Sequence, residues 1–198
     1  MQVQQIKEAI FIITDILDLE NYPELFNTVM TESNIKPASK GGRKMCRMTE
    51  PGMKYTIGGH PYARKNYTET VKKIRREIET KLRFTPGYFN TCTLNYYANG
   101  NSGFRNHSDS MPDLEQPMYV TMLTLGDSNR VMELTNRLTG EVYRLELPHN
   151  SMILMGPYMQ RTWYHGVPHD KSITKPRLSL SFRRQKVGQM VQAILTKF

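Results

Sequence analysis

The sequence predicts an α+β protein in which helices come first and a β-rich core follows. Two observations carry this prediction. Residues 19–29 and 68–82 repeat apolar side chains at helical spacing. After Pro86, short apolar segments alternate with turn residues instead. Several short strands separated by turns are typical of an antiparallel β-sandwich or barrel rather than of a parallel doubly wound sheet.

The first part of the chain supplies a strand and the helices. Ala9–Ile13 is rich in β-branched residues and predicts a strand. Residues 34–59 are rich in Gly, Pro, Lys and Arg, which predicts an exposed, flexible and basic loop with a short strand at Lys54–Ile57. The second helix should begin at a Thr68 or Thr70 cap. Apolar residues mark the two helices: Leu19, Tyr22, Leu25, Phe26 and Val29 in the first, and Val71, Ile74, Ile78 and Leu82 in the second.

The β-rich core is expected from six segments. They are Tyr88–Tyr97, Met118–Leu125, Arg130–Asn136, Val142–Leu147, Ser151–Met155 and Arg177–Arg183.

Composition limits the partners and the compartment. Lys and Arg number 27 against 18 Asp and Glu, a net charge of +9, which favours a polyanion such as nucleic acid as partner. Cys46 and Cys92 stand far apart in no metal-binding or disulfide pattern. No apolar run approaches the roughly 20 residues of a membrane span, and the N-terminus lacks a signal-peptide pattern. We therefore expect an intracellular protein, cytoplasmic or nuclear, that is not secreted and has no membrane partner.

Three residues have the chemistry of a metal site. His107 and Asp109 are two residues apart, so on an extended segment both side chains leave the same face. Such a pair is by itself more often a surface feature than a metal site. His165, in "RTWYHGVP" after an aromatic-rich strand, adds a second imidazole. Two imidazoles and one carboxylate suit non-haem Fe(II) with open coordination positions.

The segment "KPRLSLSFRR" alternates in character. Arg177 and Arg183 share one face with Ser179 and Ser181, while the leucines and the phenylalanine share the other. Two arginines on one face could hold a dicarboxylate, because a guanidinium binds carboxylates bidentately and stays charged. In "TCTLNYYANG", Asn95 and Tyr97 form a similar polar face. The alternative is a solvated outer face.

Four motifs occur in the order and spacing of a known family. "FNTCTLNYYANGNSGFRNHSD", "LGDSNRVMEL", "WYHGVP" and "PRLSLSFR" resemble the AlkB family of Fe(II)- and 2-oxoglutarate-dependent dioxygenases. The likeness runs through roughly Tyr55–Arg184, and "IFIITDILDLENYPELF" resembles the family's entry strand and helix. Each motif alone is weak, whereas their order makes the set specific.

The resemblance implies a fold, a domain and cofactors. The fold is a double-stranded β-helix (jelly roll) with the N-terminal helices packed on one sheet. One domain would span residues 1–198: the N-terminal strand, helices and substrate lid in 1–87, the core in 88–184 and a tail in 185–198. His107, Asp109 and His165 would hold the catalytic Fe(II). The residues expected to bind 2-oxoglutarate are Asn95, Tyr97, Arg177 (at its distal carboxylate) and Arg183 (nearer the metal).

The resemblance also implies an activity. The chain would demethylate N-alkylated bases of the N1-methyladenine or N3-methylcytosine type in DNA or RNA, using O₂ and releasing formaldehyde, succinate and CO₂. A base within a duplex would have to be flipped out. Two alternatives stay open: the same oxygenase chemistry on a protein side chain, and a nucleic-acid-binding module with a vestigial pocket. The sequence leaves the oligomeric state unknown, and a monomer is our default expectation.

The likeness is weaker around the substrate. Relatives that repair bases commonly carry an acidic residue two positions after H-x-D, where this chain has Met111. Ile57 stands where an aromatic residue often stacks on the flipped base, and Tyr55 or Tyr62 could supply that face instead. Basic residues that could contact phosphates are Arg43, Lys44, Arg47 and Arg64.

Overall fold

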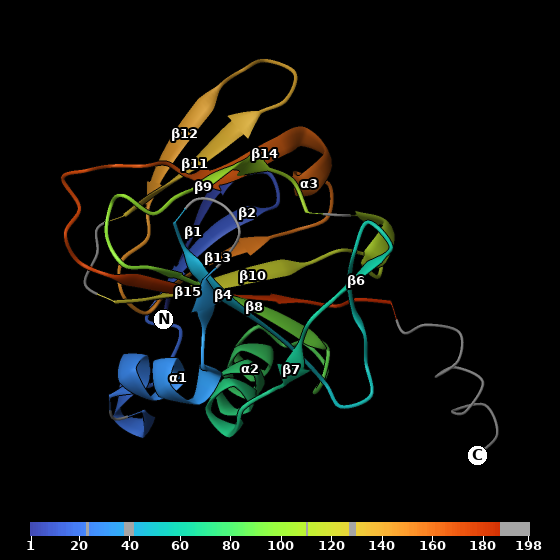
Figure 1. Cartoon of the computed structure of the whole chain (residues 1–198). Helices are drawn as coiled ribbons and strands as arrows, with labels where there is room; N and C mark the ends of the chain where they lie inside the picture. The colour runs from blue at the N-terminus through green and yellow to red at the C-terminus, as the bar shows by residue number, and fades with distance from the viewer. Residues whose placement is uncertain (23, 38–41, 110, 127–129, 187–198) are drawn as a thin grey trace.

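The computed structural model describes residues 1–22, 24–37, 42–109, 111–126 and 130–186, apart from the side chains of Pro37 and Met111. Most of the described strands join two sheets that face each other, the smaller above the larger in Figure 1, and every strand pair in them but β4–β7 is antiparallel. Residues 187–198, most of the expected tail, lie outside the described part.

The larger sheet carries strands from both halves of the chain. Its order is β1 (Gln2–Lys7), β2 (Ile10–Thr14), β13 (Ser151–Met155), β10 (Val120–Leu125), β15 (Arg177–Arg183), β8 (Thr91–Tyr97), β4 (Lys44–Thr49) and β3 (Lys36–Pro37), with β7 (Lys65–Asn66) paired to β4. The smaller sheet has the order β12 (Val142–Glu146), β11 (Val131–Asn136), β14 (Trp163–Val167) and β9 (Phe104–His107). A separate hairpin joins β5 (Tyr55–Ile57) to β6 (His60–Tyr62).

Two helices cover the face of the larger sheet that points away from the smaller one (Figure 1). They are α1 (Leu25–Ser33), which follows a short 3-10 turn η1 (Leu19–Asn21), and α2 (Glu69–Lys81). The Thr68 hydroxyl accepts a hydrogen bond from the Val71 N–H and caps α2, as predicted. Val29, Ile74 and Ile78 are buried against Leu178, Leu180 and Phe182 of β15. The expected arrangement of helices on one sheet is confirmed.

A second core lies between the two sheets. Met122 and Ile153 from the larger sheet are buried with Met132, Leu134 and Trp163 from the smaller one. This cluster fills one end of the jelly roll, on the β11, β12 and β13 side. The polar face of β15 also points into the space between the sheets, and its apolar face packs against the helices. The predicted alternation therefore separates these two faces.

The six predicted core segments all contain strands, and Ser151–Met155 and Arg177–Arg183 have the predicted bounds. One expectation is wrong. Residues 34–59 do not form one flexible basic loop, because Lys44–Thr49 is a strand hydrogen-bonded along β8 from Lys44↔Tyr96 to Thr49↔Thr91. This strand was not predicted because Gly- and Lys-rich residues flank it, although Met48 and Thr49 in it are buried. Two short helical segments, η2 (Met111–Asp113) and α3 (Met159–Thr162), complete the fold.

In the described residues, we find no helix of the length and hydrophobicity needed to cross a membrane.

Candidate active site

Strand pairing brings the three predicted metal ligands together. His107 ends β9 and lies opposite His165 of β14, with 4.2 Å between the ring centroids. Asp109 follows two residues later. One ligand atom from each of the three residues lies within 4.8 Å of the others, a separation that a single metal ion can bridge. The arrangement of two imidazoles and a carboxylate suits iron.

The protonation states of these groups are those that metal binding requires. Burial, together with the neighbouring His107, lowers the pKa of His165 to about 3. Burial also lowers the pKa of His107. For Asp109, burial opposes ionisation, but the Arg183 guanidinium outweighs it and holds the pKa of this carboxyl at about 2. Near neutral pH the site therefore presents two neutral imidazoles and one carboxylate.

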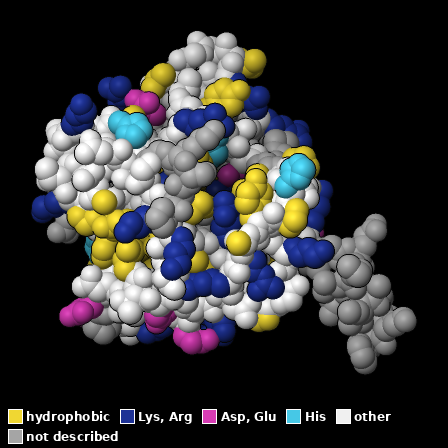
Figure 2. Space-filling view, viewed as in Figure 1, with side chains coloured by type: hydrophobic (Ala, Val, Ile, Leu, Met, Phe, Trp, Pro, Cys, Tyr) yellow, Lys and Arg dark blue, Asp and Glu magenta, His cyan; other side chains and the backbone are white. Residues whose placement is uncertain are grey.

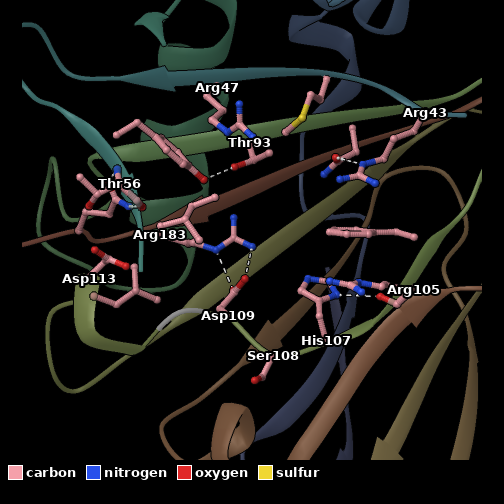
Figure 3. Close-up of a pocket in the computed structure, with 17 residues that line it drawn as sticks. Arg43, Arg47, Thr56, Thr93, Arg105, His107, Ser108, Asp109, Asp113 and Arg183 are labelled. Carbon is pink, nitrogen blue, oxygen red and sulfur yellow. Dashed lines mark hydrogen bonds and ion pairs between the residues drawn. The ribbon is translucent and has the colours of Figure 1, made fainter. Parts of the chain in front are cut away.

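Neighbouring groups fix the orientation of the ligands. The Arg105 carbonyl accepts a hydrogen bond from His107 Nδ1 at 3.0 Å, which leaves the lone pair on Nε2. His165 Nδ1 is buried and has no hydrogen-bond partner among the described residues, as expected of a nitrogen kept for another ligand. Asp109 accepts two hydrogen bonds from Arg183, at 2.8 and 2.9 Å (Figure 3).

Gln160 also supports this loop, although no sequence pattern marks it as a site residue. It lies on α3, just before the strand of His165, and only 1% of it is exposed. Its Oε1 accepts a hydrogen bond from the Asp109 backbone N–H at 2.8 Å. The segment that precedes His165 therefore holds the backbone of Asp109.

The predicted dicarboxylate residues face one another across two neighbouring strands. In the pairing of β8 with β15, Arg177 lies opposite Tyr97 and Ser179 opposite Asn95. Arg177 is fully buried, and its guanidinium carbon lies 5.7 Å from the centroid of the Tyr97 ring. Burial lowers the Arg177 pKa to about 10, so the group is still charged at neutral pH.

The buried charge of Arg177 is only partly compensated. Its Nη2 donates to the Thr124 hydroxyl at 3.1 Å, and no described side chain forms an ion pair with it. Its Nε and Nη1 are buried and have no hydrogen-bond partner among the described residues. Unpaired buried donors on a cation are costly, and a carboxylate would satisfy them.

A cavity of about 250 Å³ is lined by His107 and Asp109, two of the three predicted ligands. Figure 3 shows Asp109, His107 and Arg183 on one side of it and Thr56 and Asp113 on the other. A smaller cavity, lined by Asn95, Tyr97 and both histidines among others, lies deeper between the sheets. The arrangement combines three residues that can hold a metal, an anion site behind them and an open pocket in front.

The four residues predicted to bind substrate differ in placement. Tyr55 is buried at the cavity wall, where its hydroxyl lies 2.6 Å from the Thr93 hydroxyl, and Ile57 lines the cavity while 39% exposed. Tyr62 is 42% exposed and packs on the Arg47 guanidinium 4.6 Å from the ring centroid, but it does not line the cavity. The Met111 side chain lies outside the described residues.

Of the four basic residues expected at phosphates, Arg43 and Arg47 line the cavity. Arg43 lies over the Phe104 ring, 3.6 Å from its centroid, and its Nε donates to the Asn95 side-chain oxygen at 3.0 Å. Lys44 and Arg64 do not border the cavity. From the sequence, Arg43 was predicted only as a residue that could contact phosphates. Its hydrogen bond to Asn95 depends on the fold.

A family model described as the 2OG-Fe(II) oxygenase superfamily matches residues 7–185. This chain belongs to the 2OG-Fe(II) oxygenase superfamily. Its cofactors are therefore Fe(II) and 2-oxoglutarate, as the sequence motifs implied.

Similarity to curated relatives supports the AlkB family, which the motifs also predicted. Over 149 residues it is 26% identical to DNA oxidative demethylase ALKBH2 of Mus musculus, covering 72% of this chain and 61% of that protein. Over 120 residues it is 27% identical to alpha-ketoglutarate-dependent dioxygenase alkB homolog 3 of Homo sapiens, covering 56% and 42%. The matches thus span about half the length of these relatives.

Two solved oxygenase structures share the fold. OsALKBH1 superposes with a TM-score of 0.67 at 14% identity, over 92% of this chain and 100% of that one. A prolyl-4-hydroxylase of Pseudomonas putida superposes with a TM-score of 0.54 at 16% identity, over 90% and 94%. The predicted jelly-roll fold is confirmed.

Proposed function

We propose that this chain oxidatively demethylates N-alkylated bases in nucleic acid, with Fe(II) held by His107, Asp109 and His165. The observation that carries the proposal is the three-ligand cluster, with His165 buried and His107 and Asp109 half-buried, beside an open, arginine-lined cavity. The fit of a metal is supported by the unpartnered His165 Nδ1 and by the single tautomer that Arg105 selects at His107. With 2-oxoglutarate and O₂, Fe(II) supplies the oxidation that releases the methyl group as formaldehyde.

We propose that 2-oxoglutarate lies between β8, β15 and the metal ligands. Arg177 has the free donors for the distal carboxylate, and Arg183, which already contacts Asp109, lies at the metal end. Tyr97 packs on Arg177, and Arg43 engages the Asn95 oxygen so that the amide N–H₂ is what Asn95 can offer a carboxylate. These residues bind and orient the cosubstrate and keep water from its buried end.

The proposed substrate class is N1-methyladenine or N3-methylcytosine in DNA or RNA. The ALKBH2 relatives are named DNA oxidative demethylases. Arg43, Arg47 and Arg105 line the cavity, and Figure 2 shows Lys and Arg side chains outnumbering acidic ones on this face. A polyanion suits such a surface, because Lys and Arg neutralise its phosphates. We propose that Ile57 and Tyr55 form the wall nearest to the base.

Formaldehyde release from matched DNA and RNA oligonucleotides carrying either methylated base tests this function. We expect loss of one methyl group by mass, dependent on Fe(II) and 2-oxoglutarate. We also expect binding of the oligonucleotide to weaken steeply as salt rises, because phosphate contacts release counterions. Unmethylated oligonucleotides of the same sequence are the control. Steady succinate production without methyl loss would contradict the nucleic-acid substrate and favour oxidation of a protein side chain. Binding that needs no iron, with no 2-oxoglutarate consumed, would indicate a vestigial pocket.

Replacing Gln160 with methionine should weaken metal binding about ten-fold. Methionine keeps the volume of this buried side chain but leaves the Asp109 N–H without its acceptor. Losing a group that orients a metal ligand typically costs 10–100-fold in metal affinity. Titration with Mn(II), followed by electron paramagnetic resonance, measures the affinity without turnover. Gln4→Met, on the exposed strand β1, is the control. Equal Mn(II) affinity in Gln160→Met and wild type would rule out this role.

A further inference from the structure

The β5–β6 hairpin forms one wall of the cavity, and its strands pair with neither the larger nor the smaller sheet. Tyr55, Thr56 and Ile57 line the cavity, yet β5 and β6 hydrogen-bond only to each other among the described strands. The position of this wall therefore depends on side-chain contacts. Two residues outside the predicted site, Asp113 and Gln185, supply four of these contacts.

Asp113 holds the tip of the hairpin. Its two carboxylate oxygens accept hydrogen bonds from Gly58 N at 2.5 Å and Gly59 N at 3.0 Å. Both glycines have positive φ, +59° and +78°, as a two-residue hairpin loop of this type requires. The turn thus presents two successive N–H groups to one carboxylate, and such charge-assisted bonds are stronger than neutral ones.

Gln185 holds the base of the hairpin. Its side-chain Nε2 donates to the Thr56 carbonyl at 2.5 Å, and its Oε1 accepts from the Thr56 N–H at 3.4 Å, as a paired strand would. Gln185 is 4% exposed. The Asn90 side chain fixes its backbone, accepting from its N–H at 2.7 Å and donating to its carbonyl at 2.8 Å. Gln185 is therefore a rigid support.

Asp113 and Gln185 each follow a residue of the predicted site closely in the sequence. Asp113 follows Asp109 by four residues, and Gln185 follows Arg183 by two. The wall opposite the predicted ligands is thus tied to the segments that contain them. Ile57 lies next to the clamped turn and faces the cavity, so its position over a bound substrate depends on the tip.

We propose that Asp113 is a latch that keeps the β5–β6 hairpin closed over the cavity, and that Gln185 fixes the hairpin's base. Both are positioning residues, and their effect on turnover rests on the proposed function. Releasing the tip widens the cavity on the side away from the metal ligands. A closed wall holds the substrate and excludes water from it, so loss of the latch weakens substrate binding more than it slows the chemical step.

Hydrogen-exchange mass spectrometry on the full chain tests the latch without any turnover. We expect Asp113→Ala to speed amide exchange in residues 55–62 about ten-fold, since bonds to a charged group are lost. Exchange in β8, β10 and β15 should not change. Gln185→Leu should speed exchange at 55–57. Glu115→Ala removes the same charge two residues from Asp113 and should leave the hairpin as in wild type. Unchanged exchange at 55–62 in Asp113→Ala, or acceleration spread evenly over the sheets, would overturn the proposal.

Turnover gives a second readout. With a methylated oligonucleotide, we expect the KM of Asp113→Ala to rise about ten-fold while kcat stays within about two-fold. Glu115→Ala, which does not line the cavity, should keep the wild-type KM and the wild-type rate of succinate formation without oligonucleotide. An equal loss of kcat and kcat/KM with unchanged KM would contradict the latch. If no variant demethylates any oligonucleotide, the proposed function fails, and the exchange experiment still decides the latch.

Discussion

His107→Ala should abolish 2-oxoglutarate turnover and reduce Mn(II) affinity by more than about a hundred-fold. Removing a group that merely orients a ligand costs 10–100-fold in affinity, so removing a ligand should cost more. The fold should persist, because the His107 imidazole is half-buried and its hydrogen bond is to the nearby Arg105 carbonyl. Succinate formation and Mn(II) titration measure the two effects.

His149→Ala is the matched control for this variant. It also removes one imidazole that makes one hydrogen bond, accepted by Nδ1 from Gly126 N at 3.0 Å, but His149 is not among the residues around the cavity. Turnover and Mn(II) affinity should match those of wild type. Comparable Mn(II) affinity in His107→Ala and His149→Ala would show that His107 is not a ligand.

Alternation and periodicity were enough to predict most of the fold. In β15, the sequence separates Leu178 and Leu180, which pack under the helices, from Ser181 and Arg183, which line the cavity between the sheets. This pattern is readable because each face meets a different environment. The Thr68 cap of α2 was also predictable, since capping depends on residues close in the sequence.

Groups that depend on tertiary contacts were not predictable. Gln160 and Gln185 support the site through hydrogen bonds to residues 51 and 129 positions away, and no local pattern marks them. Strand β4 was missed because its neighbours along the sequence are loop-like, and its pairing with β8 is what makes it a strand. Local sequence carries little information about such partners.

Two buried arginines illustrate the difference between a structural and a functional charge. Both lie near the Tyr97 ring, Arg130 at 5.1 Å and Arg177 at 5.7 Å from its centroid. Arg130 donates to the carbonyls of Asn99, Ser102 and Pro168, and only its Nε is without a partner among the described residues. Arg177 has one described acceptor, Thr124, and two donors without a partner in the described residues. The structure thus retains an under-compensated cation where the proposed cosubstrate carboxylate would lie.

Arg177→Met should therefore change stability and cosubstrate affinity in opposite directions. Without 2-oxoglutarate, the variant should be more stable than wild type. Its free energy of unfolding should be higher by about 1 kcal/mol or more, because an uncompensated buried charge is removed. Its KM for 2-oxoglutarate should rise about a hundred-fold or more, because a buried carboxylate loses its charged partner. Urea unfolding and succinate formation measure these quantities.

Arg130→Met is the informative comparison. This variant also removes one guanidinium charge that lies near the Tyr97 ring, but it leaves buried carbonyls without donors. Its free energy of unfolding should therefore fall by about 2 kcal/mol or more. Addition of 2-oxoglutarate with Mn(II) should raise the melting temperature of wild type and Arg130→Met, and not that of Arg177→Met. If Arg177→Met were as destabilised as Arg130→Met and still responded to 2-oxoglutarate, Arg177 would be a structural arginine. The carboxylate site would then have to be sought elsewhere between the sheets.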